Sequence, residues 1–116
     1  MELRFIDLNH MKRYQALKAS PYSRNDIEYN SAYYLLTLLS RPVEKYVSRY
    51  GTEFEALIKD SMYWDAQERA IVNLANSLFS GVMDHKTDIH DIFKYLRDPY
   101  HRAAINVIKY RYHIQD

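Results

Sequence analysis

The sequence lacks cysteine altogether and has only two glycines and three prolines among 116 residues. Without cysteine there is no disulfide framework and no cysteine-based zinc site, a composition that suits a reducing compartment. The scarcity of glycine and proline predicts few tight turns and long regular elements, which favours helices over a β fold with many turns.

Long apolar runs are also missing. No stretch approaches the roughly 20 residues that a membrane-spanning helix needs, and the opening residues lack the basic start and unbroken apolar run of a signal peptide. The net charge is +1, from 16 basic and 15 acidic residues, so nothing global favours nucleic acid or an anionic membrane. Gly51 and Gly81 stand alone and form no phosphate-binding loop. We therefore expect a cytoplasmic protein that does not contact membranes and needs no cofactor.

What the sequence does contain is apolar residues at helical spacing, divided by capping and stop signals. No alternating pattern bounded by turn dipeptides competes with them. The sequence predicts one all-α bundle over residues 1–116, with about six helices joined by short loops and residues 1–6 as an extended N-terminal arm. The predicted helical segments are 8–19, a central apolar helix that ends near 39, a segment that begins at 42, a short helix after a break at 51, and the segments 65–81, 87–97 and 98–114.

Several helix ends and faces can be predicted in detail. Asp7 or Asn9 can cap the first helix, and Asp65 with Glu68 suits the start of the segment 65–81. Capping-box spacing also occurs in the pairs Ser23 and Asp26, Asn25 and Glu28, and Thr52 and Glu55. Asp98 is expected to cap the last helix, with Pro99 at its first position. Ile89 and Tyr112 are expected to face inward.

Several segments resemble a small, uncharacterised all-helical protein family of Firmicutes and their phages and mobile elements. The resemblance begins in FIDLNHMKRYQAL, where Phe5, His10, Arg13 and Tyr14 match a Phe-x-x-x-x-His-x-x-Arg-aromatic opening, and continues in SAYYLL, ERAIVNLANSLFSG and DIFKYLRDPYHRAAINVIKYRY. These are helix-packing patterns, and residues 41–64 are the least alike. The resemblance implies a short accessory protein and no catalytic residues.

Tyrosine is abundant, with 12 residues beside four phenylalanines and one tryptophan. The run SMYWD places Met62, Tyr63 and Trp64 consecutively in a predicted loop, where they cannot all face one core. Such side chains are enriched in protein interfaces. The sequence therefore predicts a partner-binding surface formed by Tyr46, Tyr50, Met62, Tyr63 and Trp64. The alternative is a loop that plugs the bundle, with Trp64 packed before the Asp65 cap.

The C-terminal run KYRYH interleaves cations with aromatic residues, as nucleic-acid-binding surfaces do. Lys109 and Arg111 could bind phosphates there, and Lys12 could extend the patch if the two ends of the chain meet. The alternative is a helix whose last cations complement its own dipole. With the net charge near neutral, we expect nucleic acid to be the less favoured partner.

The run MDHKTDIHDIF raises the question of a metal site, with His85, Asp88, His90 and Asp91 as ligands of a hydrolase. Position 94, four residues after His90, is a lysine, so the paired histidines of a helical metal site are absent. The simpler interpretation is a set of acidic residues, Asp84 among them, at a helix N-terminus. Arg4 and His10 have the spacing of a ribonuclease signature, but Arg4 falls in the arm and His10 is expected to pack in the first helix.

These observations predict a non-enzymatic protein, a monomer or small homo-oligomer, that acts by binding another protein. A phage or mobile-element accessory or inhibitor protein would fit this description. The nucleic-acid-binding module and the metal-dependent hydrolase remain the alternatives.

Overall fold

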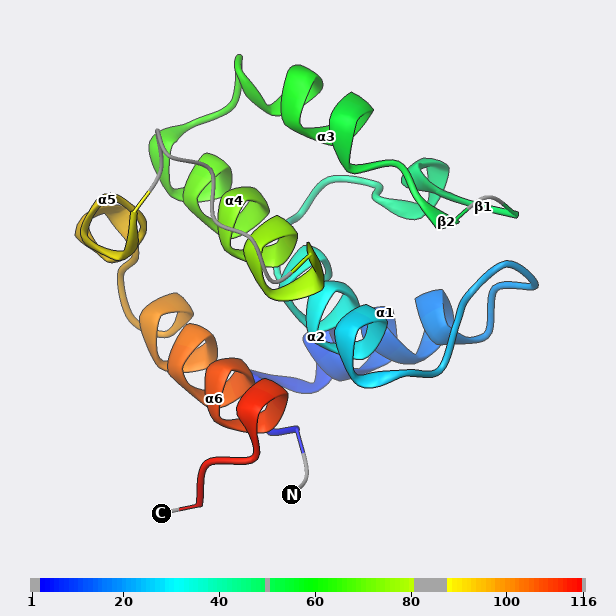
Figure 1. Cartoon of the computed structure of the whole chain (residues 1–116), viewed down its shortest axis with the longest axis horizontal. Coiled ribbons are helices and arrows are strands. Elements are labelled where there is room, and N and C mark those ends of the chain that lie inside the picture. Colours follow the sequence, from blue (N-terminus) through cyan, green and yellow to red (C-terminus); the bar gives the residue numbers. More distant parts are fainter. Residues whose placement is uncertain (1–2, 50, 81–87, 116) are drawn as a thin grey trace.

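Within the residues that the structure describes, the fold is all-α, as the sequence predicts, apart from one short hairpin that was not predicted. The computed structural model describes residues 3–49, 51–80 and 88–115. Six α-helices lie within these ranges (Figure 1): α1 (Leu8–Lys18), α2 (Ile27–Leu36), α3 (Phe54–Ser61), α4 (Ala66–Ser80), α5 (Ile89–Tyr95) and α6 (Tyr100–Tyr112). A 3-10 turn, η1 (Glu44–Tyr46), and two strands, β1 (Val47–Ser48) and β2 (Gly51–Thr52), connect α2 to α3.

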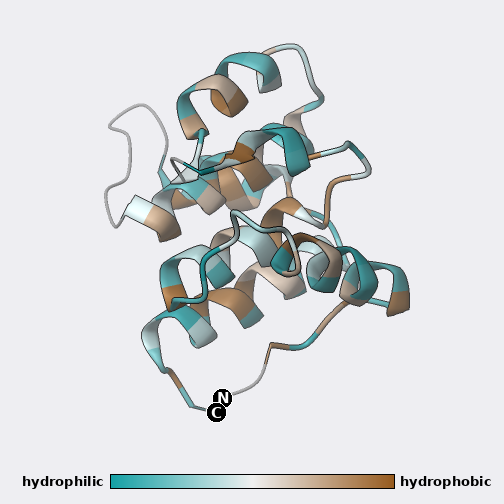
Figure 2. Cartoon of the chain, turned by 90° about the vertical axis from the view of Figure 1, so that its right-hand side faces the viewer, coloured by the Kyte–Doolittle hydropathy of each residue, from teal (hydrophilic) through white to brown (hydrophobic). Residues whose placement is uncertain are grey.

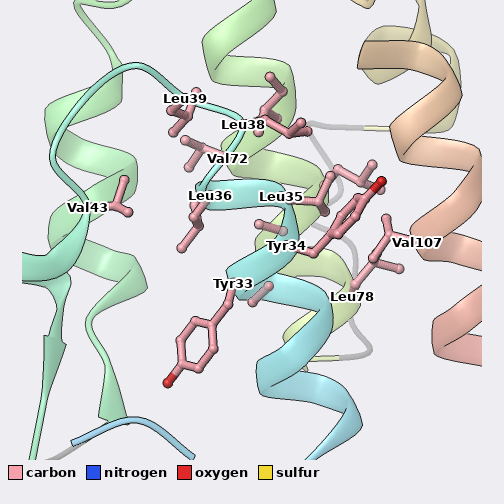
Figure 3. Packing of buried hydrophobic residues seen from close by; sticks show 14 of the residues in the cluster. Tyr33, Tyr34, Leu35, Leu36, Leu38, Leu39, Val43, Val72, Leu78 and Val107 are labelled. Atoms are coloured by element: carbon pink, nitrogen blue, oxygen red, sulfur yellow. The ribbon is translucent and has the colours of Figure 1, made fainter. Parts of the chain in front are cut away.

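Helix α2 lies at the centre of the molecule, as predicted. Every residue from 31 to 39 is buried, which requires neighbours on all sides of the helix. Helices α4 and α6 make its largest contacts, and α1 adds a smaller one. Figure 3 shows buried side chains such as Leu35, Leu78 and Val107 gathered between α2, α4 and α6. The buried apolar residues form one contiguous core.

The other helices are amphipathic and cover this centre. Helix α4 contacts α2, α3, α5 and α6 and so links the two sides of the molecule. Figure 2 shows apolar and polar residues alternating along the helices, as one-sided burial requires. Across the described ranges, no helix has both the length and the apolar character needed to cross a membrane.

The first helix and the arm before it agree with the prediction. The Asp7 side chain accepts a hydrogen bond from the backbone N–H of His10 at 2.7 Å, which caps α1. In the described part of the arm, residues 3–6, the side chains of Leu3, Phe5 and Ile6 pack on the core.

The predicted ends of α2 need correction. Its N-cap is Asp26, whose side chain accepts from the N–H of Tyr29 at 2.9 Å, so neither predicted capping box forms. The helix ends at Leu36 rather than near residue 39. The Thr37 hydroxyl donates to the carbonyl of Tyr33 at 2.7 Å, inside the last turn. Residues 37–39 remain buried without continuing the helix.

The segment after Pro42 is not the predicted helix. It forms η1 and then an antiparallel hairpin in which Val47 pairs with Thr52 and Ser48 with Gly51. Gly51 has φ +104°, and a Cβ there would lie 2.8 Å from the Tyr29 hydroxyl. Only glycine fits this backbone without strain or collision. The break predicted at Gly51 is confirmed, and the short hairpin that contains it was not predicted.

The predicted N-terminal cap is absent in α3 but present in α4. Helix α3 follows the break as predicted, but Glu53 is its N-cap and no Thr52–Glu55 capping box forms. For α4, the predicted box is present. The N–H of Glu68 donates to Asp65 Oδ1 at 2.8 Å, and the N–H of Asp65 donates to Glu68 Oε1 at 3.4 Å.

Helix α6 and two predicted inward residues also need correction. Asp98 does not cap α6, which begins at Tyr100; its carboxylate instead pairs with Arg102 at 2.5 Å. Ile89 and Tyr112 are 62% and 51% exposed, so neither faces the core. Ile89 is the first residue of α5, and Tyr112 is the last residue of α6.

Candidate functional site

The turn between α3 and α4 places three bulky residues in a row at the surface. Helix α3 ends at Ser61, and Met62 is its C-cap. The N–H of Trp64 donates to the Ser61 carbonyl at 3.0 Å, and the Asp65–Glu68 capping box then starts α4. Hydrogen bonds on both sides therefore hold residues 62–64 in a defined turn.

The three residues divide between solvent and core. Tyr63 is 91% exposed and Met62 is 64% exposed, the two largest values among the large hydrophobic residues in the described ranges. Trp64 is half-buried and packs against the hydrophobic core. Trp64 therefore packs on the bundle, as the alternative predicted, while Met62 and Tyr63 face solvent.

Trp64 is held in place by an arginine from the loop after α2. The Arg41 guanidinium lies over the indole ring, 4.4 Å from its centroid. The same guanidinium forms a bidentate pair with Glu68, with Nε to Oε2 at 2.7 Å and Nη2 to Oε1 at 3.1 Å. Since Glu68 also belongs to the α4 capping box, the ring, the cation and the helix start form one connected unit.

Arg13 of α1 fixes the loop that carries Arg41. Its guanidinium donates to three carbonyl oxygens: those of Thr37 at 3.0 Å, Arg41 at 2.8 Å, and Leu39. These carbonyls follow the early end of α2 and would otherwise lack helical partners. Arg13, one of the residues in the family resemblance, therefore has a structural role in this fold.

A small cleft lies beside the Trp64 ring. Its volume is about 320 Å³, and it is lined by Arg41, Pro42, Lys45, Tyr46, Asp60 and Trp64. The Tyr46 hydroxyl donates to Asp60 Oδ2 at 2.5 Å. Burial, together with this carboxylate, raises the pKa of Tyr46 to about 12. Tyr46 is only 3% exposed, so it forms the floor of the cleft rather than a contact surface.

Of the predicted partner-binding residues, the structure brings Met62, Tyr63 and Trp64 together in the turn, with Tyr46 in the cleft beside Trp64. Tyr50 lies outside the described residues. The sequence did not predict that Arg41 and Glu68 belong to this surface. The capping-box spacing gave one signal for Glu68, but no local pattern connects position 41 with position 64, because their contact is tertiary.

The predicted nucleic-acid-binding residues do not form one outward-facing patch. Arg111 donates from Nε to the Leu78 carbonyl at 2.8 Å, and its Nη2 lies 3.8 Å from Glu28 Oε1. Its side chain is only 18% exposed. Arg111 therefore caps the end of α4, whereas Lys12 is exposed on α1 and Lys109 is half-buried on α6.

The predicted metal ligands can be placed only in part. His85 and Asp84 lie outside the described residues. Asp88, His90 and Asp91 are exposed. Asp88 Oδ1 accepts a hydrogen bond from the N–H of Asp91 at 2.9 Å, so its carboxylate caps α5. In residues 3–49, 51–80 and 88–115, no group of three His, Cys, Asp or Glu side chains is arranged to hold a metal ion.

A larger groove of about 660 Å³ lies between α3 and the end of α4. Phe54 and Phe79 contribute aromatic rings whose centroids are 5.1 Å apart. Glu53, Glu55 and Lys59 are also among its lining residues. Because its charged groups have both signs, the groove does not point to one class of ligand.

His10 is fully engaged inside the protein rather than in a catalytic pair with Arg4. Its ring is 2% exposed and lies edge-on to Phe5 and Tyr34, with centroids 5.1 and 4.7 Å away. The expectation that His10 packs in the first helix is confirmed. Three residues of the Phe-x-x-x-x-His-x-x-Arg-aromatic pattern, Phe5, His10 and Tyr14, share this aromatic cluster.

Comparison with known proteins adds no relative: no family model matches the chain, and no curated protein or solved structure matches it.

Proposed function

We propose that this protein acts by binding another protein through the turn between α3 and α4, with Tyr63 and Met62 as the inserted side chains and Trp64 with Arg41 as their support. This role is non-enzymatic. The observation that carries the proposal is the 91% exposure of Tyr63 directly beside a tryptophan that is fixed by an arginine.

The physical argument rests on the cost of exposing apolar area. Burying apolar surface stabilises a protein by roughly 25 cal/mol for each Å² removed from water. A large side chain left in water does not contribute this free energy. Met62 and Tyr63 remain exposed to solvent, whereas Trp64 packs against the core. A partner that covers them recovers this free energy. Because the turn is already held by hydrogen bonds, little ordering entropy opposes binding.

The chemistry of the neighbouring residues fits the same role. Interface hot spots are enriched in tryptophan, tyrosine and arginine, and Arg41, Tyr63 and Trp64 meet at this turn. Lys45 and Asp60 place charges of both signs at the adjacent cleft. This arrangement resembles the apolar centre and polar rim of a protein interface.

The setting of this role is part of the same proposal. The sequence resemblance supports a cytoplasmic accessory or inhibitor protein of a phage or mobile element. The partner would then be a protein of the host or of the element itself. The proposed unit is a monomer or small homo-oligomer.

Site-specific photocrosslinking tests the proposal. A photoreactive phenylalanine analogue replaces Tyr63, and the protein is exposed to native host extract. The matched control carries the analogue in place of Tyr22, which is 50% exposed in the loop after α1. We expect one protein to be crosslinked from position 63 and not from position 22.

The affinity of that partner decides the outcome. Tyr63→Ala should weaken binding by at least about tenfold, as loss of a hot-spot side chain does, and Tyr22→Ala should leave it unchanged. Because Tyr63 is exposed, Tyr63→Ala should leave the protein folded. Unchanged Trp64 fluorescence would verify this. Equal affinity of Tyr63→Ala, Met62→Ala and the unmodified protein for every captured partner would contradict the proposal.

A further inference from the structure

A second feature of the molecule, remote from the proposed binding turn, is the way His10 holds the arm of residues 3–6. The backbone N–H of Ile6 donates to His10 Nδ1 at 3.3 Å. On the other side of the ring, His10 Nε2 lies 2.7 Å from the carbonyl oxygen of Tyr34 in α2. One imidazole therefore joins the arm, α1 and α2.

These two partners allow only one form of the ring. An amide N–H can only donate, so Nδ1 must carry a lone pair. A carbonyl can only accept, so Nε2 must carry the proton. The ring that fits is the neutral tautomer with hydrogen on Nε2. Protonation at Nδ1 would place an N–H against the N–H of Ile6 and remove the acceptor.

The rest of the arm is held by a small number of contacts. The Tyr34 hydroxyl donates to the carbonyl of Arg4. Phe5 packs on Tyr14 and Tyr34, with centroids 5.2 and 5.7 Å away, as well as on His10. Leu3, Phe5 and Ile6 are only partly buried, and none of the described residues 3–6 belongs to a helix or strand. By contrast, the fully buried core comes from the helices and the segments between them.

We propose that His10 is a pH-sensitive latch: protonation of its ring releases residues 3–6 from the bundle, while the helices stay folded. Release exposes Phe5 and Ile6 and uncovers the faces of Tyr14 and Tyr34 that Phe5 occupies. The latch is separate from the turn between α3 and α4 and does not depend on the binding role proposed for it.

Burial of the imidazole favours the neutral ring in the docked state. Burial is the largest effect and lowers the pKa of His10 below its ordinary 6.5. The Tyr34 carbonyl and Asp7 act in the opposite direction, and Arg13 acts with burial. Burial also raises the pKa of Tyr34 to about 12, so its hydroxyl stays neutral through the acidic range. Of the two contacting side chains His10 and Tyr34, only the imidazole can therefore change charge in this range.

The direction of the effect follows from proton binding. The released form has the higher His10 pKa and binds the proton more tightly than the docked form. Docking is therefore at full strength above pH 6.5 and weakens as the pH falls from 6.5 through the lower pKa of the docked ring. With one proton involved, the ratio of released to docked arm rises by up to about tenfold for each pH unit in that range.

Amide hydrogen exchange and NMR spectra between pH 7.5 and about pH 4 test the latch, within and below the ordinary range of histidine. We expect the Ile6 amide, which donates to the ring, to lose protection with a midpoint that matches the titration of the His10 ring. The amides of Val72 and Leu74 in α4 and the fluorescence of Trp64 should stay unchanged over the same range. Those residues report the helical bundle rather than the arm.

Two matched variants complete the experiment. His10→Gln keeps an acceptor and a donor without titrating, so its arm should stay docked at every pH. His90→Gln removes an exposed histidine and should retain the transition. Three results would overturn the latch: an arm that stays protected after His10 has titrated, an arm that exchanges together with α4 at one midpoint, or a transition that persists in His10→Gln. If His10→Gln does not fold, the comparison of the two midpoints in the unmodified protein decides.

Discussion

The Arg41 guanidinium covers one face of the Trp64 ring at 4.4 Å while it pairs with Glu68 through two hydrogen bonds. The two residues are far apart in the sequence and come from the loop after α2 and the turn before α4. Their contact joins the central helix to the turn that exposes Tyr63. It also means that the single tryptophan of the chain reports directly on the proposed binding surface.

Removing the Arg41 guanidinium should therefore change the signal of Trp64. Arg41→Met keeps an apolar stem but removes the cation and both bonds to Glu68. We expect the Trp64 emission to shift to longer wavelength, because the uncovered ring face meets water. The thermal midpoint should also fall, because Glu68 stays half-buried without its partner.

Arg102→Met is the control for Arg41→Met. Arg102 also pairs with a carboxylate, that of Asp98, but both side chains are more than half exposed. Such a pair contributes little to stability. Identical emission spectra and thermal midpoints for the two variants would show that Arg41 does not support the turn.

Gly51 should not tolerate alanine. Its φ of +104° is strained for any residue with a side chain, and the new Cβ would lie 2.8 Å from the Tyr29 hydroxyl. We expect Gly51→Ala to lower the free energy of unfolding by about 1–3 kcal/mol, the range for backbone strain at such a position. Urea unfolding followed by Trp64 fluorescence gives the value.

Tyr29→Phe separates the two causes of that loss. It removes the hydroxyl that the new Cβ would meet but leaves the backbone conformation of Gly51 as it is. The loss caused by Gly51→Ala should therefore be smaller in the Tyr29→Phe background. An equal loss in both backgrounds would mean that the backbone alone carries the cost.

Nucleic acid should not bind measurably at physiological salt. Phosphate contacts through Lys12, Lys109 and Arg111 would release counterions, so affinity would fall by about 0.9 log units per log unit of salt for each contact on duplex DNA. We expect no binding to duplex or single-stranded probes in a salt titration followed by fluorescence anisotropy. Salt-sensitive, sub-micromolar binding that Lys109→Ala with Arg111→Ala abolishes would replace the protein-binding proposal.

That double variant needs its own fold control. Arg111 donates to the Leu78 carbonyl, so Arg111→Ala should destabilise the end of α4. Loss of nucleic-acid binding in Lys109→Ala alone, with an unchanged unfolding curve, would establish a direct phosphate contact.

Protein purified without chelator should contain no stoichiometric metal. Asp88 already uses its carboxylate to cap α5, which leaves it poorly placed as a ligand. Elemental analysis for zinc, manganese and iron is the measurement. A full equivalent of metal that His85→Ala or His90→Ala removes would favour the hydrolase alternative, whose activity would then follow the titration of a metal-bound water near neutral pH.

Local sequence determined that the six described helices form and where α1 and α4 begin. Asp7 caps α1 as predicted, and Asp65 with Glu68 forms the predicted box, because capping depends on residues three positions apart. The buried character of α2 was equally readable, since its apolar residues occupy all sides of the helix. The loop at residues 62–64 followed from three bulky residues that cannot share one face.

Tertiary contacts decided the rest. The segment 42–52 has an apolar pattern in helical phase, but the approach of Tyr29 to Gly51 and the pairing of Val47 with Thr52 make it a hairpin. Helix α2 ends early where Arg13, more than 20 residues upstream, donates hydrogen bonds to the carbonyls of the following loop. Which of Met62, Tyr63 and Trp64 faces solvent depended on Arg41. These outcomes depend on groups that are distant in sequence and meet only in the folded chain, so no local pattern encodes them.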